Sequence, residues 1–177
     1  MLKLTHRAML LTLFILGLAE LPIPSIAQTL QIDALKANYL NGFIDFLRWE
    51  GGQSKSAASI GVVGSQQLVN HLNKIAGRKS NGRELEILSF DSVSELRKVD
   101  ILFIAHGKEK EWPAICDFCR KNKILLVGEQ DGFIESGGAI EFTVRKNRLR
   151  FFISRNNAND CSIEVSSKLI ELALEDS

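Results

Sequence analysis

Two of the three cysteines in the chain stand in a C-x-x-C arrangement, Cys116 and Cys119. Such a pair performs thiol–disulfide chemistry when it lies at the N-terminus of a helix, where the helix dipole lowers a thiol pKa. Here the pair falls well inside a segment with helical periodicity, where an i, i+3 pair is poorly placed for a disulfide. We therefore predict buried or unpaired thiols without a catalytic role. A bridge from Cys116 or Cys119 to Cys161 stays open in an oxidising compartment.

The remaining residue types give no complete catalytic or metal-binding set. His71 and His106 are the only histidines beyond the N-terminal segment, and neither has ligand spacing to a second His or Cys. A zinc site is therefore not expected. The sequence also has no dinucleotide fingerprint, no P-loop and no Gly-x-Ser-x-Gly elbow. We predict a protein with no catalytic residues, no metal and no cofactor.

The segment 137–154 predicts a β-hairpin, because two runs with a period of two are joined by Lys146-Asn147. With these two residues as the turn, three pairs of apolar side chains lie opposite one another on one face. That face is predicted to belong to the core. The predicted pairs are Ile140 with Ile153, Phe142 with Phe151, and Val144 with Leu149.

The other face of the hairpin combines an acid, bases and an aromatic ring, so it is a candidate site for a ligand or a partner. Its candidate residues are Glu141, Arg148, Arg150 and Phe152. Arg150 and Glu141 could bind a small zwitterion or a partner loop, with Phe152 as a stacking surface. The alternative is an exposed ion pair between Glu141 and Arg150, worth less than about 1 kcal/mol.

Residues 31–49 predict an amphipathic helix, because apolar residues recur at spacings of three and four. The aromatic stripe of this helix includes Phe43 and Phe46. These two rings are candidate ligand or partner contacts, and simple core packing is the alternative for them.

The rest of the chain predicts an α/β fold. Strands near 59–64, 85–90, 100–105 and 123–128 alternate with helices near 66–75, 92–98 and 108–122, and a helix over 162–174 closes the chain. Strands that are apolar throughout are typical of a mostly parallel sheet with helices on both faces. We predict a three-layer sandwich, extended by the antiparallel C-terminal hairpin. Ligands in such sheets favour the carboxyl ends of the strands, here the loops 64–66, 106–108 and 129–131.

The first 27 residues predict a signal peptide. A basic start precedes the apolar run 8–18, and small residues at Ser25 and Ala27 fit cleavage after Ala27. The run is short for a membrane span, which needs about 20 residues, although an uncleaved anchor is the alternative. Cleavage leaves a domain of residues 28–177 with equal numbers of acidic and basic residues. That balance gives no electrostatic case for nucleic acid or an anionic membrane surface.

Several segments keep a characteristic order along the chain. They are 39–49 (YLNGFIDFLRW), 60–64 (IGVVG), 100–104 (DILFI), 127–133 with 137–142 (GGAIEF), 149–154 and 166–169. This ordered set resembles the YfiR family of periplasmic regulatory proteins. Asp100 departs from the family pattern, since many members have Cys there, and Glu50-Gly51 stand where Trp-Pro is common. The family's disulfide pattern therefore cannot be carried over.

The resemblance implies a periplasmic regulator that binds and represses a membrane-bound signalling protein. The expected partner is the periplasmic domain of an inner-membrane sensor protein, a diguanylate cyclase or a sensor kinase. Repression of a cyclase would control cyclic di-GMP and biofilm formation. The resemblance also implies a homodimer and a response to redox state or to a small molecule. The alternatives are a periplasmic small-molecule sensor without a cyclase partner, and a thiol enzyme built on Cys116 and Cys119.

Overall fold

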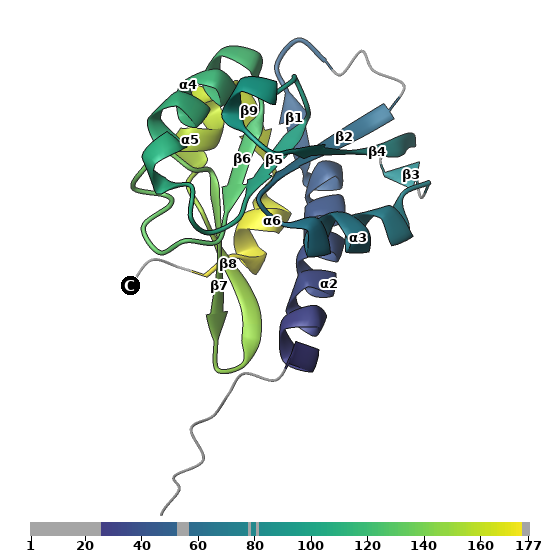
Figure 1. The fold of residues 1–177 in the computed structure, drawn as a ribbon. Coiled ribbons are helices and arrows are strands. Elements are labelled where there is room, and N and C mark those ends of the chain that lie inside the picture. The colour runs from purple at the N-terminus through teal and green to yellow at the C-terminus, as the bar shows by residue number, and fades with distance from the viewer. Residues whose placement is uncertain (1–25, 53–56, 78, 81, 175–177) are drawn as a thin grey trace, which may run out of the picture.

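The computed structural model describes residues 26–52, 57–77, 79–80 and 82–174. A seven-stranded sheet with the strand order β3-β4-β2-β5-β6-β7-β8 forms the centre of the fold (Figure 1). The pairs that join β4, β2, β5, β6 and β7 are parallel, and the outer pairs β3-β4 and β7-β8 are antiparallel. The strands are β2 (Ala57–Val63), β3 (Lys79–Ser80), β4 (Arg83–Phe90), β5 (Ile101–Ile104), β6 (Leu125–Gly128), β7 (Ile140–Arg145) and β8 (Arg148–Ile153).

Helices cover both faces of this sheet, as the apolar strands predict. The long helix α2 (Ile26–Phe43), α3 (Gln66–Ile75) and α6 (Ser167–Leu172) pack on one face, and α4 (Trp112–Asn122) packs on the other. Consecutive residues of β5 face opposite cores: Leu102 and Ile104 join the core under α4, whereas Phe103 joins the core under α2. The predicted three-layer α/β architecture is confirmed.

The strand order places a topological switch point between β2 and β5. The chain moves from β2 outward to β4 and then returns to the other side of β2 to form β5. The connection through α3 runs over one face, and the connection from β5 to β6 through α4 runs over the other. Loops that leave such neighbouring strands in opposite directions open a crevice at the carboxyl edge of the sheet.

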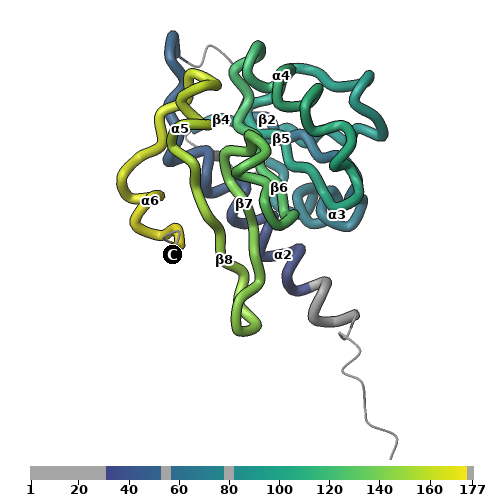
Figure 2. The backbone as a smooth tube through the Cα atoms, turned by 90° about the vertical axis from the view of Figure 1, so that its left-hand side faces the viewer, coloured from purple at the N-terminus to yellow at the C-terminus, as the bar shows by residue number. Residues whose placement is uncertain are grey.

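The hairpin has the predicted register, with Ile140 opposite Ile153, Phe142 opposite Phe151 and Val144 opposite Leu149. Lys146 and Asn147 form its turn, and both have positive φ, 50° and 62°. Two left-handed residues are what a two-residue hairpin turn requires for strands with right-handed twist. Val144 departs from the prediction, because its side chain is 48% exposed. The hairpin tip extends past the body of the sheet, alongside the N-terminal half of α2 (Figures 1 and 2).

Two helices predicted from the sequence extend too far at one end each, and the two segments concerned pair with each other as strands. The helix predicted over 31–49 ends at Phe43, a 3₁₀ turn (Ile44–Phe46) follows, and residues Leu47–Trp49 form strand β1. The helix predicted over 162–174 begins only at Ser167, after the short helix α5 (Arg155–Asp160) and strand β9 (Ile163–Val165). β1 and β9 pair antiparallel as a separate two-stranded sheet, with Leu47 opposite Val165. Each strand has three residues, too few for a period of two to stand out from a helical pattern.

Smaller differences concern the connections on the β4 side. The helix predicted over 92–98 is a single 3₁₀ turn, Val93–Glu95. Ser92 does not cap it, and its hydroxyl instead lies 2.9 Å from that of Ser94. Between α3 and β4 lies the short strand β3, for which the sequence predicted no element.

The predicted signal peptide lies almost wholly outside the described residues. Helix α2 begins at Ile26, so cleavage after Ala27 would fall in its first turn. Within the part of the chain that the structure describes, no helix is long and apolar enough to cross a membrane.

Candidate functional site

A pocket of about 650 Å³ lies at the carboxyl edge of the sheet, at the switch point. The loop after β2 contributes Gly64 and Ser65, and the residues after β5 contribute Ala105 and His106. The loop after β6 contributes Glu129 and Asp131. The three loops in which the sequence predicted ligand contacts therefore meet in one place.

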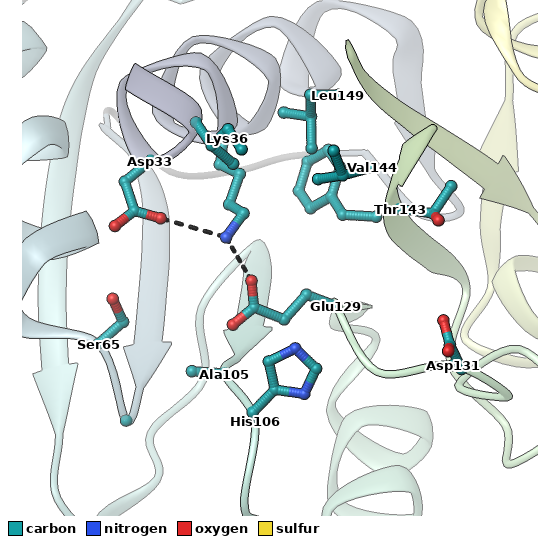
Figure 3. Close-up of a pocket in the computed structure, with 13 residues that line it drawn as sticks. Asp33, Lys36, Ser65, Ala105, His106, Glu129, Asp131, Thr143, Val144 and Leu149 are labelled. Atoms are coloured by element: carbon teal, nitrogen blue, oxygen red, sulfur yellow. Dashed lines mark hydrogen bonds and ion pairs between the residues drawn. The ribbon is translucent and has the colours of Figure 1, made fainter. Parts of the chain in front are cut away.

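Helix α2 closes the pocket from the side and carries a charge into it. The ammonium group of Lys36 lies between two carboxylates: Asp33, 3.1 Å away on the same helix, and Glu129, which accepts a short hydrogen bond from it (Figure 3). The three side chains are only 12%, 9% and 14% exposed. This charged triad, Asp33–Lys36–Glu129, joins α2 to the end of β6.

A tightly folded loop holds Glu129 and Asp131 in place. The amide of the buried Gln130 donates to the carbonyl oxygen of Ala105 at 2.5 Å, and its side-chain oxygen accepts from the backbone N–H of Glu129. Beyond them, the Phe133 ring packs directly against Gly128 and Gly138. A Cβ atom at Gly138 would lie 2.2 Å from that ring, so only glycine fits this close approach.

Glu141 of β7 anchors the same loop and does not form an ion pair with Arg150. Its buried carboxylate accepts hydrogen bonds from the backbone N–H groups of Phe133 at 2.8 Å and Ile134 at 3.2 Å. The alternative of an exposed Glu141–Arg150 ion pair is therefore wrong, because Glu141 is buried and its carboxylate is bonded to the loop 129–139. A carboxylate that takes two backbone donors is held by the fold rather than offered to solvent.

The other candidate residues of the hairpin differ in exposure, because one of them is buried and two are exposed. Phe152 is buried opposite Glu141, and the guanidinium group of Arg145 lies 4.9 Å from the centre of its ring. Phe152 therefore stacks with Arg145 of its own hairpin, at the position where the sequence predicted a stacking surface for a ligand or a partner loop. The side chains of Arg148 and Arg150 are exposed.

Phe43, the last residue of α2, and Phe46, in the 3₁₀ turn that follows, line a second, apolar groove of about 310 Å³. The groove runs between α2 and α6 and includes the exposed side chains of Leu35 and Leu172, the latter 61% exposed. Phe43 is itself buried and packs on Phe142 and Phe151, with ring centres 5.8 and 5.2 Å apart. For Phe43, the alternative of core packing is therefore correct, although one edge of its ring still borders the groove.

All three thiols are free and buried in the structure, so no bridge joins Cys116 or Cys119 to Cys161. Cys116 donates to the carbonyl oxygen of Ser136, at 3.3 Å. Burial raises the pKa of each thiol, that of Cys161 to about 11. A raised pKa disfavours the reactive thiolate, which is the opposite of what a thioredoxin-like site requires.

The two histidines among the described residues lie on different elements. His71 lies on α3, and His106 is exposed at the mouth of the pocket, near Glu129 (Figure 3). Among the described residues, no group of three or more His, Cys, Asp or Glu side chains is placed to hold a metal ion.

Sequence reasoning missed Asp33 and Lys36, although the sequence contained a signal for one of them. Asp33 stands on the same helical stripe as Ala37, Leu40 and Ile44, all of which are buried. A charged residue on a buried stripe needs a partner, and that partner could have been sought on the same helix. Glu129 could not be named as the second partner, because it lies 93 residues away in the chain.

Comparison with known proteins gives a family match and a shared fold. A family described as YfiR/HmsC-like matches residues 33–174. A search of the curated proteins finds no match. Among solved structures, a conserved domain protein from Vibrio cholerae matches with a TM-score of 0.56 and 11% identity. The ABC domain from Streptococcus pneumonia in complex with L-Trp matches with a TM-score of 0.52 and 10% identity.

Both solved structures are longer than the matched region. Each match covers 80% of this chain but only 58% and 59% of the two solved chains, respectively. At these identities the likeness shows a common α/β fold.

Proposed function

Because the chain belongs to the YfiR/HmsC-like family, we propose that it is a periplasmic regulator of a membrane-bound signalling protein. In this proposal it binds the periplasmic domain of an inner-membrane sensor protein and represses it. The sensor is a diguanylate cyclase, so repression lowers cyclic di-GMP and restrains biofilm formation.

The observation that carries the proposal beyond the family match is the apolar groove between α2 and α6. Leu35 and Leu172 are exposed there, beside Tyr39 and Phe46. Exposed apolar side chains gathered along a groove are typical of surfaces that bind an amphipathic segment of another protein. The groove is therefore the surface that we assign to the partner.

The protein acts by binding in this proposal, not by catalysis. Its buried thiols fit that role, because burial raises their pKa, whereas a catalytic thiol has a lowered pKa. The same thiols give the alternative of a thiol enzyme no support. A test for insulin reduction, in the wild type and in Cys116→Ser, should show no activity in either.

A second function is favoured by the pocket at the switch point: a periplasmic small-molecule sensor without a cyclase partner. The pocket has a volume suited to a small ligand, and it has both charged and apolar walls. The two functions differ in one observable. Only the first requires that cyclic di-GMP change when the gene is removed.

The decisive experiment measures cellular cyclic di-GMP in a strain deleted for this gene. We expect cyclic di-GMP to rise on deletion and to fall again when an exported copy is supplied. A copy that lacks residues 1–27 is the matched control and should not restore repression. If the deletion leaves cyclic di-GMP unchanged under conditions where the protein is made, the cyclase proposal is wrong and the sensor function takes its place.

Two further parts of the proposal have direct measurements. Mass spectrometry of the mature protein should find Gln28 as its first residue if the signal peptide is cleaved after Ala27. Light scattering on the purified mature protein should give twice the mass of one chain if the protein is a homodimer. A monomeric mass at micromolar concentration would remove the dimer from the proposal.

A further inference from the structure

The pocket at the switch point carries more negative than positive charge. Among its lining residues, Asp33, Glu129 and Asp131 are acidic and Lys36 is the single lysine. Lys36 is already paired with two of these carboxylates, so the triad retains one uncompensated negative charge. Because the triad is mostly shielded from water, that charge is only weakly screened.

A second wall of the pocket is mostly apolar. The hairpin contributes Phe142, Val144 and Leu149 to it together with the polar Thr143, and α2 contributes Ile32 to the lining. Figure 3 shows Thr143, Val144 and Leu149 together on the hairpin side of the pocket. The exposure of Val144 is notable because its partner across the strands, Leu149, is buried. A ligand that places an apolar body against this wall would cover the exposed valine and gain favourable burial.

These two walls together define a ligand class. We propose that the pocket binds a small primary ammonium ion with an apolar body, and that the ligand's ammonium group competes with Lys36 for Glu129. An ammonium ion neutralises the excess charge of the triad, and it has the same hydrogen-bonding geometry as the group it displaces. Anionic ligands meet three carboxylates instead, and a zwitterion adds a carboxylate to the same surroundings.

The competition has a structural consequence, because the ion pair between Lys36 and Glu129 connects α2 to the end of β6. A ligand on Glu129 releases that connection. This inference deepens the proposed regulation by naming the ligand class, and it rests on the proposed function only for the ligand's role, not for its binding.

The test compares three probes with one apolar body and different charges: 2-phenylethylammonium, L-phenylalanine and 3-phenylpropionate. Isothermal titration against the purified mature protein measures the Kd of each. We expect 2-phenylethylammonium to bind about tenfold more tightly than the other two, a difference of about 1.4 kcal/mol. Equal or tighter binding of the zwitterion or the anion overturns the proposal, and so does an absence of amine binding up to about 10 mM.

Two substitutions in the triad have opposite expected effects, which a purely structural role of the triad would not produce. Glu129→Gln removes the acceptor charge and should weaken amine binding about tenfold. Lys36→Met removes the competitor and should strengthen it by a similar factor. Glu135→Gln is the matched control, because Glu135 lies in the same loop but does not line the pocket, and its Kd should equal that of the wild type. Weaker amine binding in Lys36→Met overturns the competition.

Two precautions keep the result interpretable. If Lys36→Met does not fold, as judged by circular dichroism, Lys36→Gln removes the charge while keeping a hydrogen-bond donor. Cyclic di-GMP in the deletion strain, measured without any probe, reports on the proposed function alone. Amine binding without a change in cyclic di-GMP therefore refutes the cyclase and leaves the ligand site, and the converse refutes only the ligand site.

Discussion

Helix α2 contributes to two surfaces that differ in almost every physical respect. On one side, Asp33 and Lys36 enter a charged pocket formed by loops from three strands. On the other, Leu35 and Tyr39 line an apolar groove that is completed by α6. Specificity in the pocket depends on where a few charges lie. Binding in the groove depends on how much apolar surface the partner covers, so the exact position of each partner side chain matters less.

The two surfaces share one wall, and this wall explains how they can be adjacent without merging. Phe142 lines the pocket, Phe43 lines the groove, and their rings stack with centres 5.8 Å apart. Phe151 and Tyr39 complete the cluster, with ring centres 5.5 Å apart. The cluster therefore separates a polar ligand site from an apolar docking surface.

Removal of the shared wall should have the largest effect. Phe43→Ala leaves a cavity between α2 and the hairpin and should lower the free energy of unfolding by about 3–5 kcal/mol. Urea denaturation monitored by circular dichroism measures the loss. Phe46→Ala is the control, because Phe46 is only half-buried and borders the groove alone. Equal losses in the two variants would show that the cluster does not form the common wall.

Removal of the Lys36 charge from the pocket should lower stability by less than removal of the Phe43 ring. Lys36→Met leaves Asp33 and Glu129 facing each other without a cation, and stability should fall by about 1–2 kcal/mol, less than for a fully buried pair. Lys108→Met is the matched control, because its ion pair with Glu111 is more exposed, and it should change stability by less than about 0.5 kcal/mol. Denaturant midpoints of both variants provide the comparison. A Lys36→Met protein as stable as the wild type would contradict a structural role for the triad.

A third region, the buried thiols, belongs to neither surface and should give a separate pH response. The folded pKa of Cys161 is raised from 9.0 to about 11. Its contribution to stability is therefore fully present below about pH 9 and is lost as the pH rises towards 11. In Cys161→Ala the decline of stability across this window should be shallower than in the wild type. Thermal unfolding of both proteins at pH 8, 9, 10 and 11 measures how stability declines with pH. An equal decline in the wild type and in Cys161→Ala would refute a raised pKa for Cys161.

Substitution on the groove side should have the smallest effect on stability and still abolish function. Leu172 is mostly exposed, so Leu172→Glu should change the free energy of unfolding by less than about 0.5 kcal/mol. A charge in the apolar groove should nevertheless prevent partner binding, and cyclic di-GMP should rise to the level of the deletion strain. Gln67→Glu is the matched control, because it adds the same charge at an exposed position of α3 that lines neither the pocket nor the groove, and it should leave cyclic di-GMP at the wild-type level. Full repression by Leu172→Glu would exclude the groove as the docking surface.

The sequence predicted those features that depend on neighbouring residues or on a strong period. The hairpin register followed from Lys146-Asn147 and the alternation on either side of it. The buried strands followed from runs such as 101–104, and their order indicated which loops would reach the carboxyl edge. The sequence therefore predicted where the pocket lies, but not the charged triad that lines it.

What could not be predicted depends on contacts between distant residues. Glu141 looked like half of an exposed ion pair, because strand alternation says nothing of the loop that folds over it. Lys36 could not be singled out from the sequence, because its partner Glu129 lies 93 residues away in another element. Leu47–Trp49 looked helical, because a strand of three residues is defined by its partner rather than by its own pattern.

The small sheet formed by β1 and β9 has a consequence for the order in which the protein folds. Leu47 and Val165 are more than a hundred residues apart in the chain, so their pairing closes nearly the whole domain into one loop. Loop closure over such a length carries an entropic cost that is recovered only once the intervening sheet is formed. A chain that emerges N-terminus first, from a ribosome or across a membrane, must therefore hold β1 unpaired until its last segments arrive. We expect β1 and β9 to exchange their amide hydrogens sooner than the central strands β2 and β5 do, since the last contacts to form are often the first to open.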